Sequence, residues 1–377
     1  MLRVVNIVGT RPNLVKMAAV LTAERAHPDV FEPLLVHTQQ HHDPAMSEQL
    51  FAELELPPPD VRLAGPGGGQ TAQIEGMRRE LERVLAELRP DLVVVVGDVN
   101  SSAAGALAAS ALGIPIAHVE AGLRSFDRTM PEEVNRITID AVSELLFASE
   151  ASGVDNLARE GISGAAVHHV GNVMIDTLVR FHPRAARRHP AAARGLSGPY
   201  GVLTLHRPSN VDHGSTLAAL LRVIAEAARR LPIVFPVHPR TRDRLEAAGL
   251  WSVLEGLPGL HPTAPLGYLD MLALMQRAQF VLTDSGGIQE ETTYLGVPCL
   301  TLRDNTERPA TVADGTNRVV GTRPESLLAE IARLLAGDRP PPRRPPLWDG
   351  HAAERVADVL ATLGARTAAV AAGAGRG

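Results

Sequence analysis

Short apolar, β-branched runs alternate along the chain with longer Ala- and Leu-rich stretches of helical period. Runs that are apolar at successive positions are typical of strands buried on both faces of a parallel sheet. The expected strands are Val4–Val8, Leu34–His37, Leu92–Val96, Ile114–Val119 and Leu145–Ala148, then Val202–Leu205, Ile233–Val237, Phe280–Thr283 and Pro298–Leu302. The clearest helices are Leu14–Ala26, Thr71–Leu88, Ser102–Leu112, Thr216–Arg230 and Ile288–Leu295. The pattern predicts an α/β protein.

The alternation falls into two series of similar length, which predicts two doubly wound domains. We expect the first domain to cover residues 1–172 and the second to cover residues 173–349. The Pro- and Arg-rich segment Arg339–Pro346 predicts a stiff linker into a last helix over residues 350–364, which joins the first domain. The Ala/Gly-rich end, residues 368–377, is expected to be disordered.

Composition narrows the function classes. The chain of 377 residues has 45% hydrophobic and 21% charged residues, which is typical of a globular protein. A formal charge of -5 argues against a nucleic-acid partner. The single cysteine, Cys299, lies in an apolar run and predicts a buried thiol in a reducing compartment. Without an apolar run of about 18 residues or a signal peptide, we expect a cytoplasmic protein with no membrane partner.

Polar residues follow most of the predicted strands. In open α/β sheets, ligands bind at the carboxyl ends of strands, where the strand order reverses. The segments are Gly9-Thr10-Arg11-Pro12, Gly97-Asp98, His118–Gly122, His206-Arg207, His238 and Asp284–Gly287. Any one of them is explained by solvation of a loop, but six together favour a binding crevice.

The segment Asp284–Glu291 predicts a site for a diphosphate. A strand runs into Ser285-Gly286-Gly287 and a helix begins at once, so small residues let the backbone approach an anion at a helix N-terminus. Glu290 and Glu291 fit the hydroxyls of a ribose, although both residues could instead complement the helix dipole. Neither a P-loop nor a G-x-G-x-x-G motif occurs, which disfavours an ATPase or an NAD enzyme.

Two further groups contain residue types that are common in catalytic or metal sites. Glu132 follows the loop Arg124–Met130 and opens a helix that is aimed at the crevice, or else is a solvated first-turn glutamate. The residues His37, His41, His42 and Asp43 have the composition of a metal cluster. Their spacing matches no closed zinc site, so we predict no metal.

Taken together, the motifs resemble the UDP-N-acetylglucosamine 2-epimerase family, in its non-hydrolysing bacterial branch. The resemblance runs from Val4 to about Leu363. It rests on Gly9-Thr10-Arg11-Pro12 with Lys16-Met17, Gly97-Asp98, His118–Arg124, Pro131-Glu132-Glu133-x-Asn135-Arg136, His206-Arg207, Asp284–Glu291 and Arg303–Pro309.

The resemblance implies a glycosyltransferase-B-like architecture of two Rossmann-like domains with the active site in the cleft between them. Members interconvert UDP-GlcNAc and UDP-ManNAc without metal or nicotinamide cofactor, by elimination of UDP to 2-acetamidoglucal and re-addition, and a homodimer is expected. By similarity the catalytic set is Asp98, Glu120, Glu132 and His206, with His206 close to the diphosphate. The residues that the resemblance places against UDP are Arg11, Lys16, Ser285, Gly286, Gly287, Glu291 and Arg308.

The chain also departs from the family pattern. Asn13 and Ser209 stand where many members carry glutamate, which bears on fine specificity. Many bacterial members bind a second UDP-GlcNAc as an activator, and the residues that match parts of that pocket are Gln40, His41, Arg207 and His238. Asp43 replaces a glutamine and the stretch Gly67–Gly69 lacks the pocket's arginine, so we do not expect allosteric activation.

Three other functions stay open on the sequence. The first is a hydrolysing epimerase that releases ManNAc and UDP, the second a glycosyltransferase that uses a UDP-sugar donor on an external acceptor. The third is a non-catalytic sugar-nucleotide sensor, which the set of carboxylates disfavours.

Overall fold

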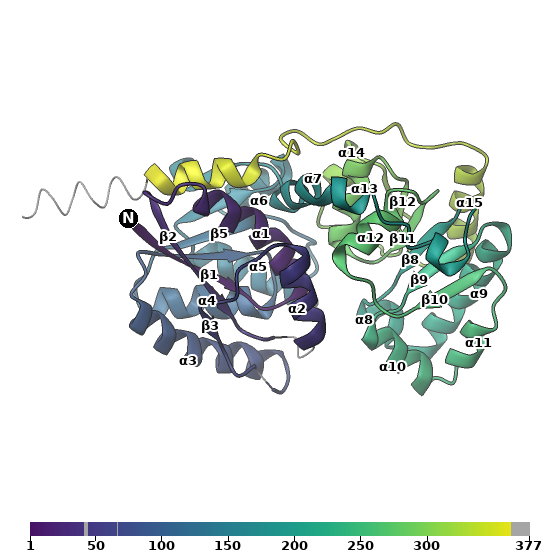
Figure 1. Cartoon of the computed structure of the whole chain (residues 1–377), viewed down its shortest axis with the longest axis horizontal. Coiled ribbons are helices and arrows are strands. Elements are labelled where there is room, and N and C mark those ends of the chain that lie inside the picture. Colours follow the sequence, from purple (N-terminus) through teal and green to yellow (C-terminus); the bar gives the residue numbers. More distant parts are fainter. Residues whose placement is uncertain (41–43, 66, 363–377) are drawn as a thin grey trace, which may run out of the picture. The chain divides into compact units, whose positions relative to one another are not determined.

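The computed structural model describes residues 1–40, 44–65 and 67–362. The chain forms two compact units, here called unit 1 and unit 2 (Figure 1). Unit 1 is Met1–Thr177 together with the segment that starts at Pro346, and unit 2 is Leu178–Pro345. The chain enters unit 2 inside helix α7 (Val173–Ala185) and returns between Pro345 and Pro346. The expected tail, residues 368–377, lies outside the described residues.

Unit 1 contains a seven-stranded sheet in which every pair of neighbours is parallel, in the order β3-β2-β1-β4-β5-β6-β7. Its strands are β1 (Leu2–Val8), β2 (Phe31–His37), β3 (Val61–Arg62), β4 (Leu92–Val96), β5 (Ile116–Ala121), β6 (Leu145–Ala148) and β7 (Val167–His169). Its helices are α1 (Arg11–Arg25), α2 (Pro44–Glu53), α3 (Gln70–Leu88), α4 (Asn100–Ala111), α5 (Pro131–Val142) and α6 (Ala151–Arg159), with a last helix over 352–362.

Helices cover both faces of this sheet. Side chains of alternate strand positions point to opposite faces, so Val5 and Val93 pack on Leu81 of α3 and Ile139 of α5. On the other face, Asn6 of β1 donates a hydrogen bond from Nδ2 to Glu24 Oε2 of α1 over 2.7 Å. Figure 1 shows α3 on one side of the sheet and the last helix on the other. This covering on both faces is why the strands are apolar at nearly every position.

Glu24 carries a testable consequence of that burial. Burial raises the pKa of the Glu24 carboxyl from 4.5 to about 8, and the hydrogen bond from Asn6 only partly opposes the rise. A raised folded-state pKa means that the stabilising contribution is complete below pH 4.5 and is lost as pH rises through about 8. Across that window the wild type should lose about 1.4 kcal/mol per pH unit from this group.

The variant Glu24→Gln does not titrate, so its thermal midpoint should exceed that of the wild type by a margin that grows from pH 5 to pH 9. Differential scanning fluorimetry across that range measures the margin, with the exposed Glu87→Gln of α3 as the matched control. Parallel curves for Glu24→Gln and the wild type would contradict the assignment.

Unit 2 repeats the architecture with a six-stranded parallel sheet in the order β10-β9-β8-β11-β12-β13. Its strands are β8 (Gly201–Thr204), β9 (Ile233–Pro236), β10 (Leu260–Thr263), β11 (Val281–Thr283), β12 (Cys299–Thr301) and β13 (Asn317–Val319). Its helices are α8 (Pro208–Val211), α9 (Gly214–Arg230), α10 (Pro239–Ala247), α11 (Trp251–Glu255), α12 (Tyr268–Met275), α13 (Gly286–Leu295), α14 (Ala310–Ala313) and α15 (Pro324–Leu335). Leucines of α9 and α15 pack on one face in a single core with Leu203, Phe235 and Leu282.

These two units confirm the predicted α/β class of two Rossmann-like doubly wound sheets. Four strands were not predicted, and all four lie at or next to a sheet edge: β3, β7, β10 and β13. The last helix begins at 352 because Gly350, with φ 88°, has a left-handed backbone. Cys299 is buried as expected, and burial raises the pKa of its thiol to about 12. Over the described ranges, each helix is too short or too polar to cross a lipid bilayer.

Candidate active site

The strand order reverses once in each sheet, between β1 and β4 in unit 1 and between β8 and β11 in unit 2. Four of the six polar segments selected from the sequence follow these four strands. Thr10 and Arg11 follow β1, and Gly97-Asp98 follow β4. His206 and Asp284 follow β8 and β11. These are the positions where open α/β sheets bind ligands, so each unit has a candidate site of its own.

Glu120 stands at an irregular point of β5. The register against β6 shifts between Val119 and Ala121, and Glu120 has φ 72°, which is rare for a residue with a side chain. Its carboxylate is only 4% exposed and forms an ion pair with Lys16 of α1. A strained residue of this kind persists only where the surrounding structure fixes it, and such residues cluster at functional sites. The bulge therefore aims a buried, paired carboxylate at the end of the sheet.

Asp98 stands in the turn after β4, directly after Gly97. Gly97 has φ 66°, and a Cβ on it would lie 3.1 Å from Lys16 Nζ and 3.3 Å from Glu120 Oε2. The Asp98 carboxylate forms an ion pair with Arg136 of α5, and its backbone carbonyl accepts a hydrogen bond from Asn135 over 2.8 Å. Gly97 therefore packs against the Lys16–Glu120 pair, while the next residue, Asp98, is held by α5.

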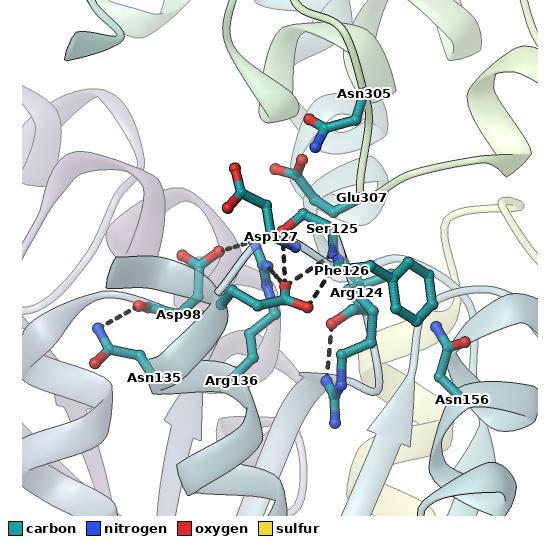
Figure 2. A network of polar contacts seen from close by, with 12 residues as sticks. Asp98, Arg124, Ser125, Phe126, Asp127, Asn135, Arg136, Asn156, Asn305 and Glu307 are labelled. Atoms are coloured by element: carbon teal, nitrogen blue, oxygen red, sulfur yellow. Dashed lines mark hydrogen bonds and ion pairs between the residues drawn. The ribbon is translucent and has the colours of Figure 1, made fainter. Parts of the chain in front are cut away.

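The loop before α5 is held by the second glutamate of Pro131-Glu132-Glu133. The buried Glu133 carboxylate accepts hydrogen bonds from Ser125 N at 2.8 Å, Ser125 Oγ at 2.9 Å and Phe126 N at 2.9 Å. It also pairs with Arg136 at 2.9 Å, which links the loop to Asp98 (Figure 2). Glu132 itself is half-buried in the first turn of α5.

Sequence reasoning missed Glu133 and Arg136 as parts of this site. The signal was present, because residues three apart on a helix face each other and Glu133 and Arg136 have opposite charge. Asn13 also has a structural role that its sequence position did not predict. It donates from Nδ2 to Val96 O over 2.7 Å, which fixes the start of α1 to the end of β4.

In unit 2, Asp284 anchors the loop after β8. Its buried carboxylate accepts hydrogen bonds from His206 N at 3.0 Å and Arg207 N at 2.9 Å, and its Oδ1 lies 2.9 Å from His206 Nδ1. Burial alone would raise the pKa of Asp284, but His206 and these hydrogen bonds lower it to about 2. Asp284 is therefore ionised and orients the His206 ring, which is one-third exposed.

The start of α13 is packed against a buried arginine. Ser285 is the residue at the N-cap, and a Cβ on Gly286 would lie 2.3 Å from Arg308 Nη1, so a larger residue there would displace the Arg308 side chain. Arg308 pairs with Glu290 at 2.9 Å and with Glu307 at 2.6 Å. Glu290 is therefore a partner of Arg308. Gly287 and Glu291 lie in the first turns of the same helix, with Glu291 7% exposed.

The residues selected for a second site fall in both units. Gln40 Oε1 accepts hydrogen bonds from Ser101 N at 2.9 Å and Ser101 Oγ at 2.7 Å, at the start of α4. The His238 ring centre lies 5.5 Å from that of His206, and Arg207 Nη2 lies 3.8 Å from Glu307 Oε1. His41 and Asp43 lie outside the described residues. In the described part of the chain, no group of three or more His, Cys, Asp or Glu is arranged to hold a metal ion.

The candidate sites of the two units differ in chemistry. Unit 1 presents the buried Glu120 beside Lys16 and the partly buried Asp98 beside Arg136, and such carboxylates suit proton transfer. Unit 2 presents a histidine, a buried arginine and a helix N-terminus, which suits an anion such as a diphosphate.

Comparisons with known proteins point to one family. The family model described as UDP-N-acetylglucosamine 2-epimerase matches residues 23–361. A UDP-N-acetylglucosamine 2-epimerase of Methanococcus maripaludis is 40% identical over 361 residues, which are 94% of this chain and 97% of that protein. A UDP-2,3-diacetamido-2,3-dideoxy-D-glucuronate 2-epimerase of Pseudomonas aeruginosa is 39% identical over 367 residues, which are 96% of this chain and 100% of that protein.

Solved structures agree with the sequence relatives. The crystal structure of the Methanocaldococcus jannaschii UDP-GlcNAc 2-epimerase in complex with UDP-GlcNAc and UDP has a TM-score of 0.90 and 39% identity, covering 95% of this chain and 99% of that chain. The Neisseria meningitidis UDP-GlcNAc 2-epimerase bound to UDP-GlcNAc has a TM-score of 0.87 and 29% identity, with the same coverage. The glycosyltransferase-B-like class predicted from the sequence is confirmed by these neighbours. The chain belongs to the UDP-N-acetylglucosamine 2-epimerase family.

Proposed function

We propose that the protein interconverts UDP-N-acetylglucosamine and UDP-N-acetylmannosamine without hydrolysing either. The observation that carries the proposal is two carboxylates at the carboxyl ends of the neighbouring strands β4 and β5, Asp98 and Glu120, each in an ion pair with a cation. Relatives of this name at 40% identity, and a neighbour that binds UDP-GlcNAc and UDP, support the substrate. We further propose that it acts as a cytoplasmic homodimer, as the family resemblance implies.

The chemistry explains why several carboxylates are needed. The C2 proton of the sugar is not acidic, because no carbonyl adjoins it. We infer that a carboxylate removes this proton while the anomeric C–O bond breaks, so UDP leaves with the bonding electrons and a C1–C2 double bond forms. A second acid then donates a proton to C2 from the opposite face, the electrons of the double bond form the new C–H bond, and the UDP oxygen attacks the oxocarbenium-like C1. Asp98, Glu120 and Glu132 fit the acid and base roles.

The remaining residues fit the leaving group. Departing UDP develops charge on the diphosphate oxygen, which cationic groups and helix N-termini stabilise. His206, Arg308 and the Ser285–Gly287 turn offer such groups in unit 2, and Lys16 and Arg11 offer them in unit 1. No step of this scheme uses a metal or a nicotinamide.

Proton NMR of UDP-GlcNAc with the enzyme in deuterated water, with EDTA and without added NAD, tests the proposal. We expect UDP-ManNAc that carries deuterium at C2, because the returning proton comes from a group that exchanges with solvent. Free ManNAc would establish a hydrolysing epimerase, and turnover only with an acceptor would establish a glycosyltransferase. Full retention of the C2 hydrogen, or activity that requires a divalent metal, would contradict the scheme.

The name of the Pseudomonas aeruginosa relative suggests a second UDP-sugar that should be assayed as a substrate. That protein is named for a diacetamido-glucuronate, which carries a carboxylate that N-acetylglucosamine lacks. Lys16, Arg124 and Arg136, the buried cations of unit 1, are each already paired with a carboxylate of the chain itself. We therefore expect kcat/KM to favour the uncharged sugar, and parallel assays of both UDP-sugars measure the ratio.

A further inference from the structure

His118 of β5 is a fully buried histidine whose two ring nitrogens both face oxygen acceptors. Nδ1 lies 2.6 Å from Asp140 Oδ1, and Nε2 lies 3.1 Å from the carbonyl oxygen of Gly97. Burial opposes ionisation of Asp140, but His118 and Arg124 outweigh it and lower the pKa of that carboxyl. Asp140 is thus a carboxylate, and the carbonyl can only accept. Each ring nitrogen therefore lies within hydrogen-bond distance of an oxygen that can only accept.

Asp140 continues the network into the turn after β5. Its second oxygen, Oδ2, accepts a hydrogen bond from Gly122 N over 3.1 Å and lies 2.7 Å from Arg124 Nη2. Arg124 in turn pairs with Glu160 at 2.7 Å. One carboxylate of α5 therefore holds both the His118 ring and the backbone that follows β5.

Both backbone polar groups of Gly97 are held by β5. Its N–H donates to Val119 O over 2.9 Å, and its carbonyl accepts from the His118 ring over 3.1 Å. Asp98 is the next residue, so the position of its carboxylate depends on this peptide. Glu120 lies on the same strand between His118 and Gly122, which are both held by Asp140.

We propose that His118 and Asp140 are positioning residues that fix the three carboxylate-bearing segments of unit 1 relative to one another. The turn after β4 carries Asp98, the bulge at the end of β5 carries Glu120, and α5 carries both Asp140 and Glu132. The buried His118–Asp140 pair is bonded to all three segments. The inference rests on the proposed function and adds two residues to it.

Stability alone does not explain this arrangement. Buried ion pairs are costly to desolvate, and well-packed apolar residues of similar volume often stabilise a core equally well or better. The ring and carboxylate instead supply directional bonds to Gly97 O and Gly122 N, which no apolar pair can make. Such bonds matter for catalysis, because a misplacement of about 1 Å can reduce a rate by about 10²-fold.

Two variants test the proposal. His118→Gln has a single amide nitrogen and cannot reach both oxygens, while Asp140→Asn puts an amide where Gly122 N or His118 needs an acceptor. We expect each to lower kcat for UDP-GlcNAc epimerisation by about 10²-fold, with the Kd of UDP changed less than about two-fold. The double variant should be no slower than the slower single variant, because residues acting as a unit are non-additive.

The matched control is Val93→Ala, which truncates a buried β4 side chain in the same core without touching the pair. If kcat of the folded enzyme falls equally in the control, or stays at the wild-type level in both variants, the positioning role is overturned. Crystal structures of wild type and Asp140→Asn give a test that needs no activity. Displacement of the Asp98 and Glu120 carboxylates in Asp140→Asn supports the proposal, and unchanged positions refute it. This outcome does not depend on whether the protein is an epimerase.

Discussion

Replacement of Glu120 by Gln is expected to lower kcat by about 10²–10⁴-fold, the usual range for loss of a general acid or base. Gln keeps the size of the side chain but removes the titratable group that pairs with Lys16. Asp98→Asn and Glu132→Gln should fall in the same range if all three residues move protons. The affinity for UDP should change far less, because the groups proposed to bind the diphosphate are not altered.

Steady-state kinetics with UDP-GlcNAc and calorimetric titration with UDP separate these two effects. Glu87→Gln is the control, since Glu87 is an exposed carboxylate of α3 in the same unit. In deuterated water, deuterium should enter C2 at a different rate in a variant that has lost one of the two proton-transfer groups than in the wild type. Wild-type turnover by Glu120→Gln would refute its assigned role.

Replacement of Arg308 by Ala should show the opposite bias and weaken UDP binding first. A hydrogen bond to a charged group contributes about 1.5–3 kcal/mol, so the Kd of UDP should rise by roughly 10–150-fold. The change also leaves the buried Glu290 and Glu307 without their shared arginine, and breaking a buried pair by removing one partner is strongly destabilising. The thermal midpoint should therefore fall as well.

Arg308→Lys distinguishes the two effects, because it keeps the positive charge beside both glutamates but loses the planar guanidinium. We expect Arg308→Lys to recover most of the stability and little of the UDP affinity. Ser285→Ala should weaken UDP binding in the same direction without the loss of stability. Arg229→Ala, at an exposed arginine of α9, is the control. Unchanged UDP affinity in Arg308→Ala would exclude Arg308 from the nucleotide site.

Much of the fold was predictable because the strands are buried on both faces. Leu92–Val96 and Leu145–Ala148 were predicted with the observed bounds, since a buried parallel strand must be apolar at successive positions. The strands that the pattern missed are short strands at or next to the sheet edges, such as Val61–Arg62 and Asn317–Val319. Strands there need fewer apolar residues, so their sequences carry a weaker signal.

The location of the candidate site could also be predicted in part. Polar residues that directly follow apolar strands, such as Asp98 and Asp284, must lie at the carboxyl edge of a parallel sheet. The sequence therefore determined which segments meet at that edge. It did not determine their partners, since Asp98 pairs with Arg136 across 38 positions and His118 contacts Asp140 across 22.

Only the tertiary structure decided how the carboxylates are held. The left-handed backbone of Glu120 comes from a bulge against β6, and its partner Lys16 comes from a helix that packs over β1. Strand order brings these elements together, and no local period of apolar residues encodes strand order. By itself the sequence determined the α/β class, the polar strand ends and the family resemblance. The strained glutamate, the His118–Asp140 pair and the anchoring role of Glu133 depend on long-range packing, which fixes angles and distances that spacing cannot specify.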